Sequence, residues 1–231
     1  MEIKIVVSED GSNTLYLPHL NETYHSLHGA VQESEHVFLK HGLMHLAQSK
    51  KKITVLEVGF GTGLNALLTY RLAMNEGIPI EYHSIEAFPL PEAIVKQLNY
   101  PTIFAAEKLD EFFHYLQSSA WDKDHRLGTN FIFHKYLTRL EDFNPAGLKA
   151  DVVFYDAFAP GKQPEMWETD KFQKLHSLMN EGGILVSYCA SGQFKRNLKD
   201  AGFMVETLPG PPGKKEMTRG LRNTEINLTE I

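Results

Sequence analysis

The sequence has one cysteine, no long apolar run and no excess of basic residues. Cys189 alone cannot form an intrachain disulfide or supply the several thiolates of a zinc–cysteine site. No apolar stretch reaches the ~20 residues that a membrane helix needs, and the polar N-terminus does not resemble a signal peptide. With 29 acidic and 23 basic residues the net charge is -6, so bulk charge gives no indication of nucleic-acid binding. These absences predict a reduced, cytoplasmic protein without a metal or a membrane segment.

What is present is typical of a folded domain: 231 residues, of which 42% are hydrophobic. Residues 1–50 are predicted to form an N-terminal extension that packs on the core. It consists of two short strands around the turn Asp10-Gly11, followed by a helix over residues 31–46. After three consecutive lysines, the pattern changes to alternating strands and helices. Residues 51–231 are therefore predicted to form the main domain.

Short apolar runs alternate with amphipathic stretches throughout the main domain, which indicates an α/β fold with helices on both faces of a mostly parallel sheet. Seven strands are expected, at residues 53–58, 80–85, 131–133, 152–155, 184–188, 203–208 and 221–228. Helices are expected at residues 64–74, 91–98, 103–116, 166–179 and 193–199.

A glycine-rich turn joins the first of these strands to the first helix, with the sequence Leu-Glu-Val-Gly-Phe-Gly-Thr-Gly-Leu-Asn over residues 56–65. Glycines allow a tight turn and a close approach of a ligand to the backbone. Glu86 ends the next strand, where a carboxylate can accept both ribose hydroxyls of an adenosine. Two cofactors remain open. The spacing Gly61-x-Gly63-x-x-Ala66 fits a dinucleotide, whereas Glu57-x-Gly59-x-Gly61-x-Gly63 is typical of S-adenosylmethionine-dependent methyltransferases.

Asp156 follows the strand at 152–155, so we expect it at the same edge of the sheet as the glycine turn. A carboxylate there can orient an attacking amine and accept its proton. With an ordinary pKa near ~4 it would orient the amine rather than abstract a proton. Phe158 and Pro160 could form an apolar wall beside it. The alternative for Asp156 is a helix N-cap or a turn residue. Trp167 could stack on a base, but core packing is the preferred interpretation.

Several segments together resemble the methyltransferase of the MnmC/MnmD family, which acts on the wobble uridine of certain tRNAs. They lie at residues 10–16, 21–26, 29–38, 56–65, 156–160, 164–167, 188–190 and 208–219. The most distinctive are Asp156-Ala-Phe-Ala-Pro160 and the Leu-Pro-Gly-Pro-Pro-Gly-Lys-Lys stretch that begins at Leu208. One departure is His134-Lys-Tyr136, where the family often has Gly-Asp-Ala near the adenine.

The resemblance implies a Rossmann-like class I methyltransferase fold and S-adenosylmethionine-dependent N-methylation of the 5-aminomethyl group of uridine 34. The product would be 5-methylaminomethyluridine. The chain resembles the form without a flavin oxidase domain, so a separate enzyme would make the aminomethyl precursor. Asp156 is the expected catalytic residue. Together with the glycine turn, the resemblance predicts cofactor contacts by Tyr24, Glu33, Glu57, Gly59, Phe60, Gly61, Thr62, Gly63, Asn65, Glu86 and Asp156.

The basic residues are unevenly distributed, which revises the conclusion from bulk charge. Residues 192–222 contain seven Lys and Arg against three acidic residues, a local charge of +4 that leaves -10 for the rest. The cluster could be a solvated surface or a phosphate-binding rim for a tRNA anticodon stem-loop. The expected substrate contacts are Phe158, Pro160, Lys214, Lys215 and Arg219. Alternative functions are a polyamine-synthase-like transferase that acts on a small amine, an NAD(P)-binding oxidoreductase and a catalytically silent tRNA-binding module.

Overall fold

The computed structural model describes residues 2–104 and 107–223. The chain begins with a small antiparallel sheet of β1 (Lys4–Val7), β2 (Asn13–Leu17) and β3 (Glu22–Thr23). At its predicted turn, Gly11 has a φ of +82°, and the Asp10 carboxylate accepts hydrogen bonds from the backbone N–H groups of Ser12 and Gln32, each at 3.0 Å. The second of these bonds ties the turn to the helix that follows.

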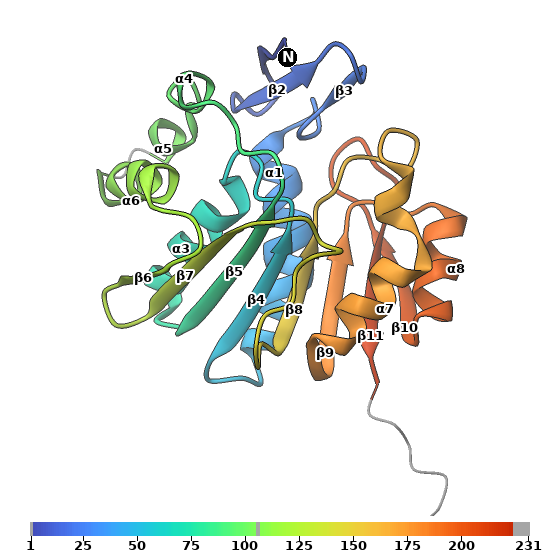
Figure 1. Cartoon of the computed structure of the whole chain (residues 1–231). Coiled ribbons are helices and arrows are strands. Elements are labelled where there is room, and N and C mark those ends of the chain that lie inside the picture. Colours follow the sequence, from blue (N-terminus) through green and yellow to red (C-terminus); the bar gives the residue numbers. More distant parts are fainter. Residues whose placement is uncertain (1, 105–106, 224–231) are drawn as a thin grey trace, which may run out of the picture.

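That helix consists of α1 (Ala30–Ser34), a π-helical segment η1 (Glu35–Leu43) and α2 (Met44–Ala47). It packs directly on the central sheet. The ring centroids of Phe38 and Phe154 lie 5.2 Å apart, and a Cβ on Gly42 would lie 3.0 Å from the side chain of Val186. The helical half of the predicted extension therefore belongs to the core of the main domain, and the small sheet at the top of Figure 1 is joined to that core through it.

The central sheet has the strand order β10-β11-β9-β8-β4-β5-β7-β6. The seven expected strands correspond to β4 (Ile53–Val58), β5 (Ile80–Glu86), β7 (Phe131–Leu137), β8 (Ala150–Tyr155), β9 (Met179–Ser187), β10 (Phe203–Pro209) and β11 (Glu216–Arg222). From β9 across to β7 all neighbours are parallel, whereas β11 pairs antiparallel with both β9 and β10. The α/β fold with a mostly parallel sheet is thus confirmed.

The structure differs from the predicted strands and helices in several places. An eighth strand, β6 (Asp124–Leu127), pairs antiparallel with β7 at the sheet edge; its polar Asp-His-Arg-Leu sequence carries little strand signal. The last strand begins at Glu216, five residues before the predicted start, and residues 224–228 of the prediction lie outside the described residues. The predicted helix at 166–179 is a 3-10 turn, η2 (Pro164–Trp167), followed by α7 (Thr169–Ser177).

Helices cover both faces of the sheet (Figure 1). The N-terminal helix, α3 (Leu64–Glu76) and α6 (Glu107–Ser118) pack on one face, over buried rings that include Tyr82 and Phe131. On the other face lie α7 and α8 (Gly192–Asp200), whose buried rings Phe172 and Phe194 pack against Tyr155 of β8. The short helices α4 (Glu92–Val95) and α5 (Tyr100–Ile103) connect β5 to α6. Within the described residues, no helix is sufficiently long and apolar to span a membrane.

The strand order reverses between β4 and β8, because the chain continues from β4 toward β5 on one side and from β8 toward β9 on the other. In an open parallel sheet, a crevice forms at such a switch point, at the carboxyl ends of the strands. Val58 pairs with Tyr155 at this edge, so the residues that follow them, Gly59 and Asp156, face each other across the crevice.

We predict that Phe38→Ala lowers the free energy of unfolding by about 3–5 kcal/mol, because it empties a buried ring site between the N-terminal helix and the sheet. Urea unfolding measures this loss. The control is Val7→Ala, which truncates a side chain that is 67% exposed and should change stability by less than about 0.5 kcal/mol. Equal, small effects of both substitutions would contradict the packing of this helix into the core.

Candidate active site

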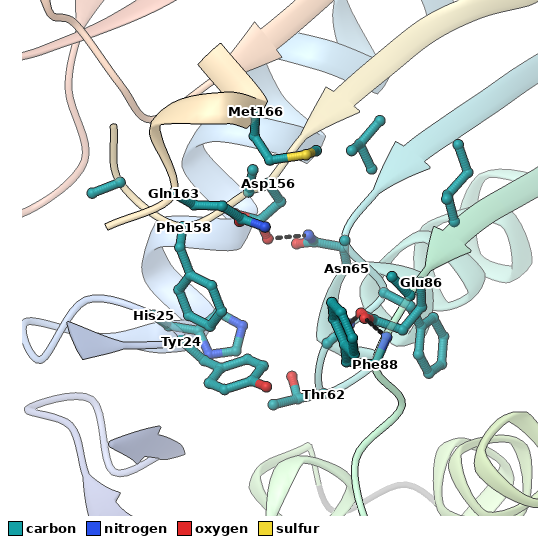
Figure 2. A pocket seen from close by; sticks show the side chains of 18 of the residues that line it. Tyr24, His25, Thr62, Asn65, Glu86, Phe88, Asp156, Phe158, Gln163 and Met166 are labelled. Carbon is teal, nitrogen blue, oxygen red and sulfur yellow. Dashed lines mark hydrogen bonds between the residues drawn. The ribbon is translucent and has the colours of Figure 1, made fainter. Parts of the chain in front are cut away.

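A cavity of about 640 Å³ opens at the carboxyl ends of β4, β5 and β8 (Figure 2). Its walls come from the glycine-rich turn, the loops after β5, β7 and β8, the N-terminal segment and the loop between β10 and β11. Segments from both ends of the chain therefore meet at one concave site, in the position expected for the ligand of a doubly wound sheet.

Two backbone contacts, one at Gly59 and one at Gly61, fix the conformation of the glycine-rich turn. Gly59 has a φ of +95°, and a Cβ there would lie 2.8 Å from the carbonyl oxygen of Asp156. Gly61 has a φ of +52°, and its N–H donates a 3.0 Å hydrogen bond to Glu86 Oε2. Phe60 and Thr62 line the cavity, whereas Gly63 is the N-cap of α3, packed against Gln117 outside the cavity lining. The turn thus exposes backbone rather than side chains to a ligand.

Glu86 lies at the end of β5 with both carboxylate oxygens held by backbone. Besides Gly61, the N–H of Phe88 donates to Oε1 at 2.7 Å. The carboxylate is fixed at the cavity wall, beside the glycine turn, where the sequence pattern predicts a ribose contact.

Glu57 does not line the cavity, in contrast to its predicted role as a cofactor contact. Its side chain is completely buried within β4, where Oε2 accepts a 2.6 Å hydrogen bond from Ser84 Oγ. Burial, together with the smaller effect of the Asp156 charge, raises the pKa of this carboxyl to about 8, and the hydrogen bond from Ser84 acts in the opposite direction. Glu57 therefore carries a proton at neutral pH, and its side chain lies within β4 outside the cavity lining.

Asp156 projects into the cavity from the end of β8, and Asn65 Nδ2 donates to its Oδ2 at 2.9 Å (Figure 2). Burial raises the pKa of Asp156 to about 7, with the nearby negative charge of Glu33 as the second cause, while the bond from Asn65 acts in the opposite direction. The expectation of an ordinary pKa was wrong, because the sequence does not show how far the N-terminal segment encloses this carboxylate.

Glu33 and Lys214 form an ion pair at the cavity wall. Glu33 is 5% exposed, and its Oε2 accepts a 2.8 Å hydrogen bond from the N–H of Ser26. The Lys214 ammonium lies 3.9 Å from the ring centroid of Tyr188. Tyr188 in turn donates from its hydroxyl to the carbonyl of Ala157 at 2.9 Å. Lys214 was predicted to lie on an outer basic rim, but it points into the site.

The remaining wall is aromatic. The rings of Tyr24 and Phe158 meet edge to face with centroids 5.0 Å apart, and His25 lies behind them (Figure 2). Burial lowers the pKa of His25 to about 4, so its imidazole is neutral at pH 7. Pro160 is not among the lining residues. Trp167 is buried, and its indole N–H donates to the carbonyl of Phe158 at 2.7 Å, so it packs in the core and supports this wall.

Three of the seven basic residues between 192 and 222, Lys214 among them, have acidic partners. Arg219 is 8% exposed and pairs with Glu206 across the β10–β11 hairpin at 2.7 Å. Lys195 pairs with Glu216 at 3.0 Å. Arg219 therefore does not reach the cavity, whereas Lys215 is exposed and follows Lys214, which lines the cavity. Of the predicted phosphate contacts Lys214, Lys215 and Arg219, the exposed one is Lys215.

The sequence patterns missed the part of the cavity that follows β7. This part is lined by Thr138, Arg139, Leu140 and Glu141. The family resemblance instead indicates contacts at His134-Lys-Tyr136, which lies within β7. Lys135 points away from the cavity: its ammonium donates to the carbonyl of Leu116 at 2.6 Å, near the end of α6, and burial lowers its pKa to about 8. The strand was predicted to end at residue 133, whereas β7 continues to Leu137, so the residues after this strand were placed too early in the sequence. The lining residues Gln163, Glu165 and Met166 had no comparable signal.

Within the described ranges, no group of three or more His, Cys, Asp or Glu side chains could hold a metal ion. His41 and His36 lie with ring centroids 4.7 Å apart on the π-helical segment, and His36 Nε2 lies 2.8 Å from the carbonyl oxygen of Pro209.

Residues 105–223 match the model of a family of S-adenosyl-L-methionine-dependent methyltransferases. The chain belongs to this family. It is also similar to the tRNA 5-methylaminomethyl-2-thiouridine biosynthesis bifunctional proteins MnmC of Burkholderia mallei (strain SAVP1) and Burkholderia pseudomallei (strain 668). Each is 30% identical over 237 residues, which cover 94% of this chain and 35% of the relative. The chain thus spans about a third of the length of these relatives.

Among solved structures, MNMC2 from Aquifex aeolicus aligns with a TM-score of 0.76 at 28% identity, over 95% of this chain and 69% of that chain. Spermidine synthase from Thermotoga maritima aligns with a TM-score of 0.51 at 10% identity, over 95% and 72%, and shares the fold alone. S-adenosylmethionine is therefore confirmed as the cofactor of the family, in preference to a dinucleotide. The contact of the glycine turn with this cofactor stays a prediction.

The residues of the cavity fit this cofactor. Glu86 offers a fixed carboxylate for the ribose hydroxyls, and the glycines leave room for a close approach of the ligand to the backbone. Acidic side chains at Glu33 and Asp156 suit a ligand that carries a sulfonium and an ammonium charge.

We predict that Glu57→Gln stabilises this methyltransferase increasingly as pH rises. The pKa of the Glu57 carboxyl is about 8 in the folded protein, against 4.5 in the unfolded chain. The free energy of unfolding of the wild type therefore falls progressively as the pH rises from 4.5 to 8. Gln cannot ionise and keeps an oxygen for Ser84. Urea unfolding at pH 5 to 8 should show the variant's advantage growing by about 2–4 kcal/mol. The exposed control Glu165→Gln should give a constant difference, and parallel curves for both variants would contradict the raised pKa.

Proposed function

We propose that this methyltransferase N-methylates the 5-aminomethyl group of uridine 34 in tRNA, giving 5-methylaminomethyluridine. The proposal is supported by its similarity to relatives named for tRNA 5-methylaminomethyl-2-thiouridine biosynthesis, along 94% of the chain. The observation that carries the chemistry is Asp156, a carboxylate with a pKa of about 7 that faces the cavity. When bound, S-adenosylmethionine supplies an electrophilic methyl group on its sulfonium.

A primary amine is mostly protonated at neutral pH and has no free lone pair until it loses that proton. The ionised Asp156 attracts the ammonium and accepts a hydrogen bond from it. Because the pKa of Asp156 is about 7, the carboxylate can also accept the proton near neutral pH. The bond from Asn65 Nδ2 fixes the carboxylate rotamer. Asp156 therefore both orients the amine and takes its proton.

The aromatic wall suits a nucleoside. Phe158 and Tyr24 offer ring faces and edges, and Gln163 and Met166 lie on the same side of the cavity as Phe158, where they add an amide and an apolar chain (Figure 2). Lys215, exposed at the edge, supplies positive charge for the backbone phosphates of the anticodon stem-loop. The proposed substrate carries an aminomethyl group, so a separate enzyme must form it first, in the cytoplasm where we place both reactions.

The direct test is incubation of the protein with labelled S-adenosylmethionine and tRNA that carries 5-aminomethyluridine at position 34. Digestion to nucleosides should yield labelled 5-methylaminomethyluridine. The control is the same tRNA with unmodified uridine 34, which lacks the amine and should remain unlabelled. Label in another nucleoside, or none in either tRNA, would refute the proposed substrate.

The pH dependence of methylation tests the role of Asp156. With both substrates far below saturation, kcat/KM should rise with pH through an apparent pKa near 7 as Asp156 ionises. Asp156→Asn should lower kcat by about 10²–10⁴ and remove this limb. Asn65→Ala should move the limb to higher pH, because the hydrogen bond that favours the ionised form is lost. An unchanged limb in the Asp156→Asn variant would exclude Asp156 as the proton acceptor.

A further inference from the structure

The Glu33–Lys214 ion pair joins two segments that lie 181 residues apart in the sequence, α1 and the loop between β10 and β11. Its side chains are only 7% and 33% exposed. The desolvation of two charges largely offsets their attraction, so such a pair adds little to stability. Both residues line the cavity, which makes them available to a bound molecule.

Different groups line the two ends of the cavity. Glu86 and the glycine turn mark the end where the adenosine is proposed to bind. Continuing past Gly59, the cavity reaches Asp156, and Lys214 lies over the ring of Tyr188, whose hydroxyl donates to the carbonyl of Ala157, the residue after Asp156. The ion pair therefore lies beyond Asp156, at the end away from Glu86. In S-adenosylmethionine, the group farthest from the adenine is an α-amino acid, with one ammonium and one carboxylate.

We propose that Glu33 and Lys214 separate to bind this zwitterion, Glu33 taking the α-ammonium and Lys214 the α-carboxylate. The inference rests on the placement of the cofactor in this cavity and not on the identity of the RNA substrate. In the absence of a ligand the two side chains neutralise each other, so neither buried charge is left unpaired. With the zwitterion bound, each retains a partner of opposite charge.

This arrangement makes Lys214 a specificity residue for the cofactor. A decarboxylated ligand still carries the ammonium, which would compete with the Lys214 ammonium for the single carboxylate of Glu33. One of the two cations would then be left without a partner in a partly buried site, which disfavours binding. The same geometry distinguishes Lys214 from its neighbour, because Lys214 is held inward by Glu33 and Tyr188 while Lys215 is exposed.

The test compares dissociation constants by calorimetry, without RNA, for three ligands. These are S-adenosylhomocysteine, its decarboxylated aminopropyl analogue and 5′-methylthioadenosine, which lacks both charges. The wild-type protein should bind S-adenosylhomocysteine about 10- to 100-fold more tightly than the aminopropyl analogue. In Lys214→Met this ratio should fall to within about threefold, because the carboxylate has lost its partner. In Glu33→Gln both ammonium-bearing ligands should weaken together, approaching 5′-methylthioadenosine.

Lys215→Met is the matched control and should leave all three constants unchanged while weakening the binding of tRNA. Thermal unfolding verifies that each variant is folded, and Lys214→Arg, which keeps the charge, should retain most of the preference for the carboxylate. A preserved ratio in a folded Lys214→Met variant would overturn the inference, as would an equal loss of affinity for all three ligands. The labelling of tRNA can fail while the ratio of dissociation constants still falls in Lys214→Met. In that case the proposed RNA substrate is wrong, and the inference about Glu33 and Lys214 is retained.

Discussion

The close contact between β4 and β8 is the constraint on which the site depends. Gly59 follows β4 at the point where a side chain would collide with the carbonyl oxygen of Asp156. The positive φ that glycine allows turns the chain away from β8 and brings the N–H of Gly61 to Glu86. One backbone contact therefore fixes both the adenosine side of the cavity and the position from which Asp156 projects.

This geometry concentrates carboxylates in a poorly solvated region, and the protein accommodates each differently. Glu57 lies deepest and is protonated at neutral pH, with Ser84 as its donor. Asp156 titrates near pH 7. Glu33 keeps a cation, Lys214, beside it. A cationic ligand placed among these groups favours their ionised forms, so binding of the cofactor and of an amine would lower the pKa of Asp156.

Local patterns were sufficient for the features that depend on neighbouring residues in the sequence. The glycine turn, Glu86 and Asp156 each follow a strand, and parallel strands bring their carboxyl ends to one edge. The direction of Lys214 could not be predicted, because its partner Glu33 lies in a segment 181 residues away. The raised pKa of Asp156 has the same origin, since burial is a property of the assembled fold.

The error at Arg219 shows how one strand boundary changes the interpretation of function. Placing the last strand at 221–228 left residues 216–220 in a loop and made Arg219 look available to phosphate. In the actual register it lies opposite Glu206 in the hairpin, and the two side chains pair. The antiparallel register was the missing information, since cross-strand neighbours of opposite charge are expected to interact.

The charge distribution also limits how an RNA substrate could be selected. Of the seven basic residues between 192 and 222, Lys195, Lys214 and Arg219 have acidic partners. The positive charge of this segment is therefore partly offset, and the acidic cavity wall would repel phosphate while attracting an ammonium. For the proposed tRNA, discrimination must arise mainly from the amine and the base that enter the cavity. A net charge of -6 is compatible with the proposed RNA substrate, because in that proposal the cationic group is carried by the substrate.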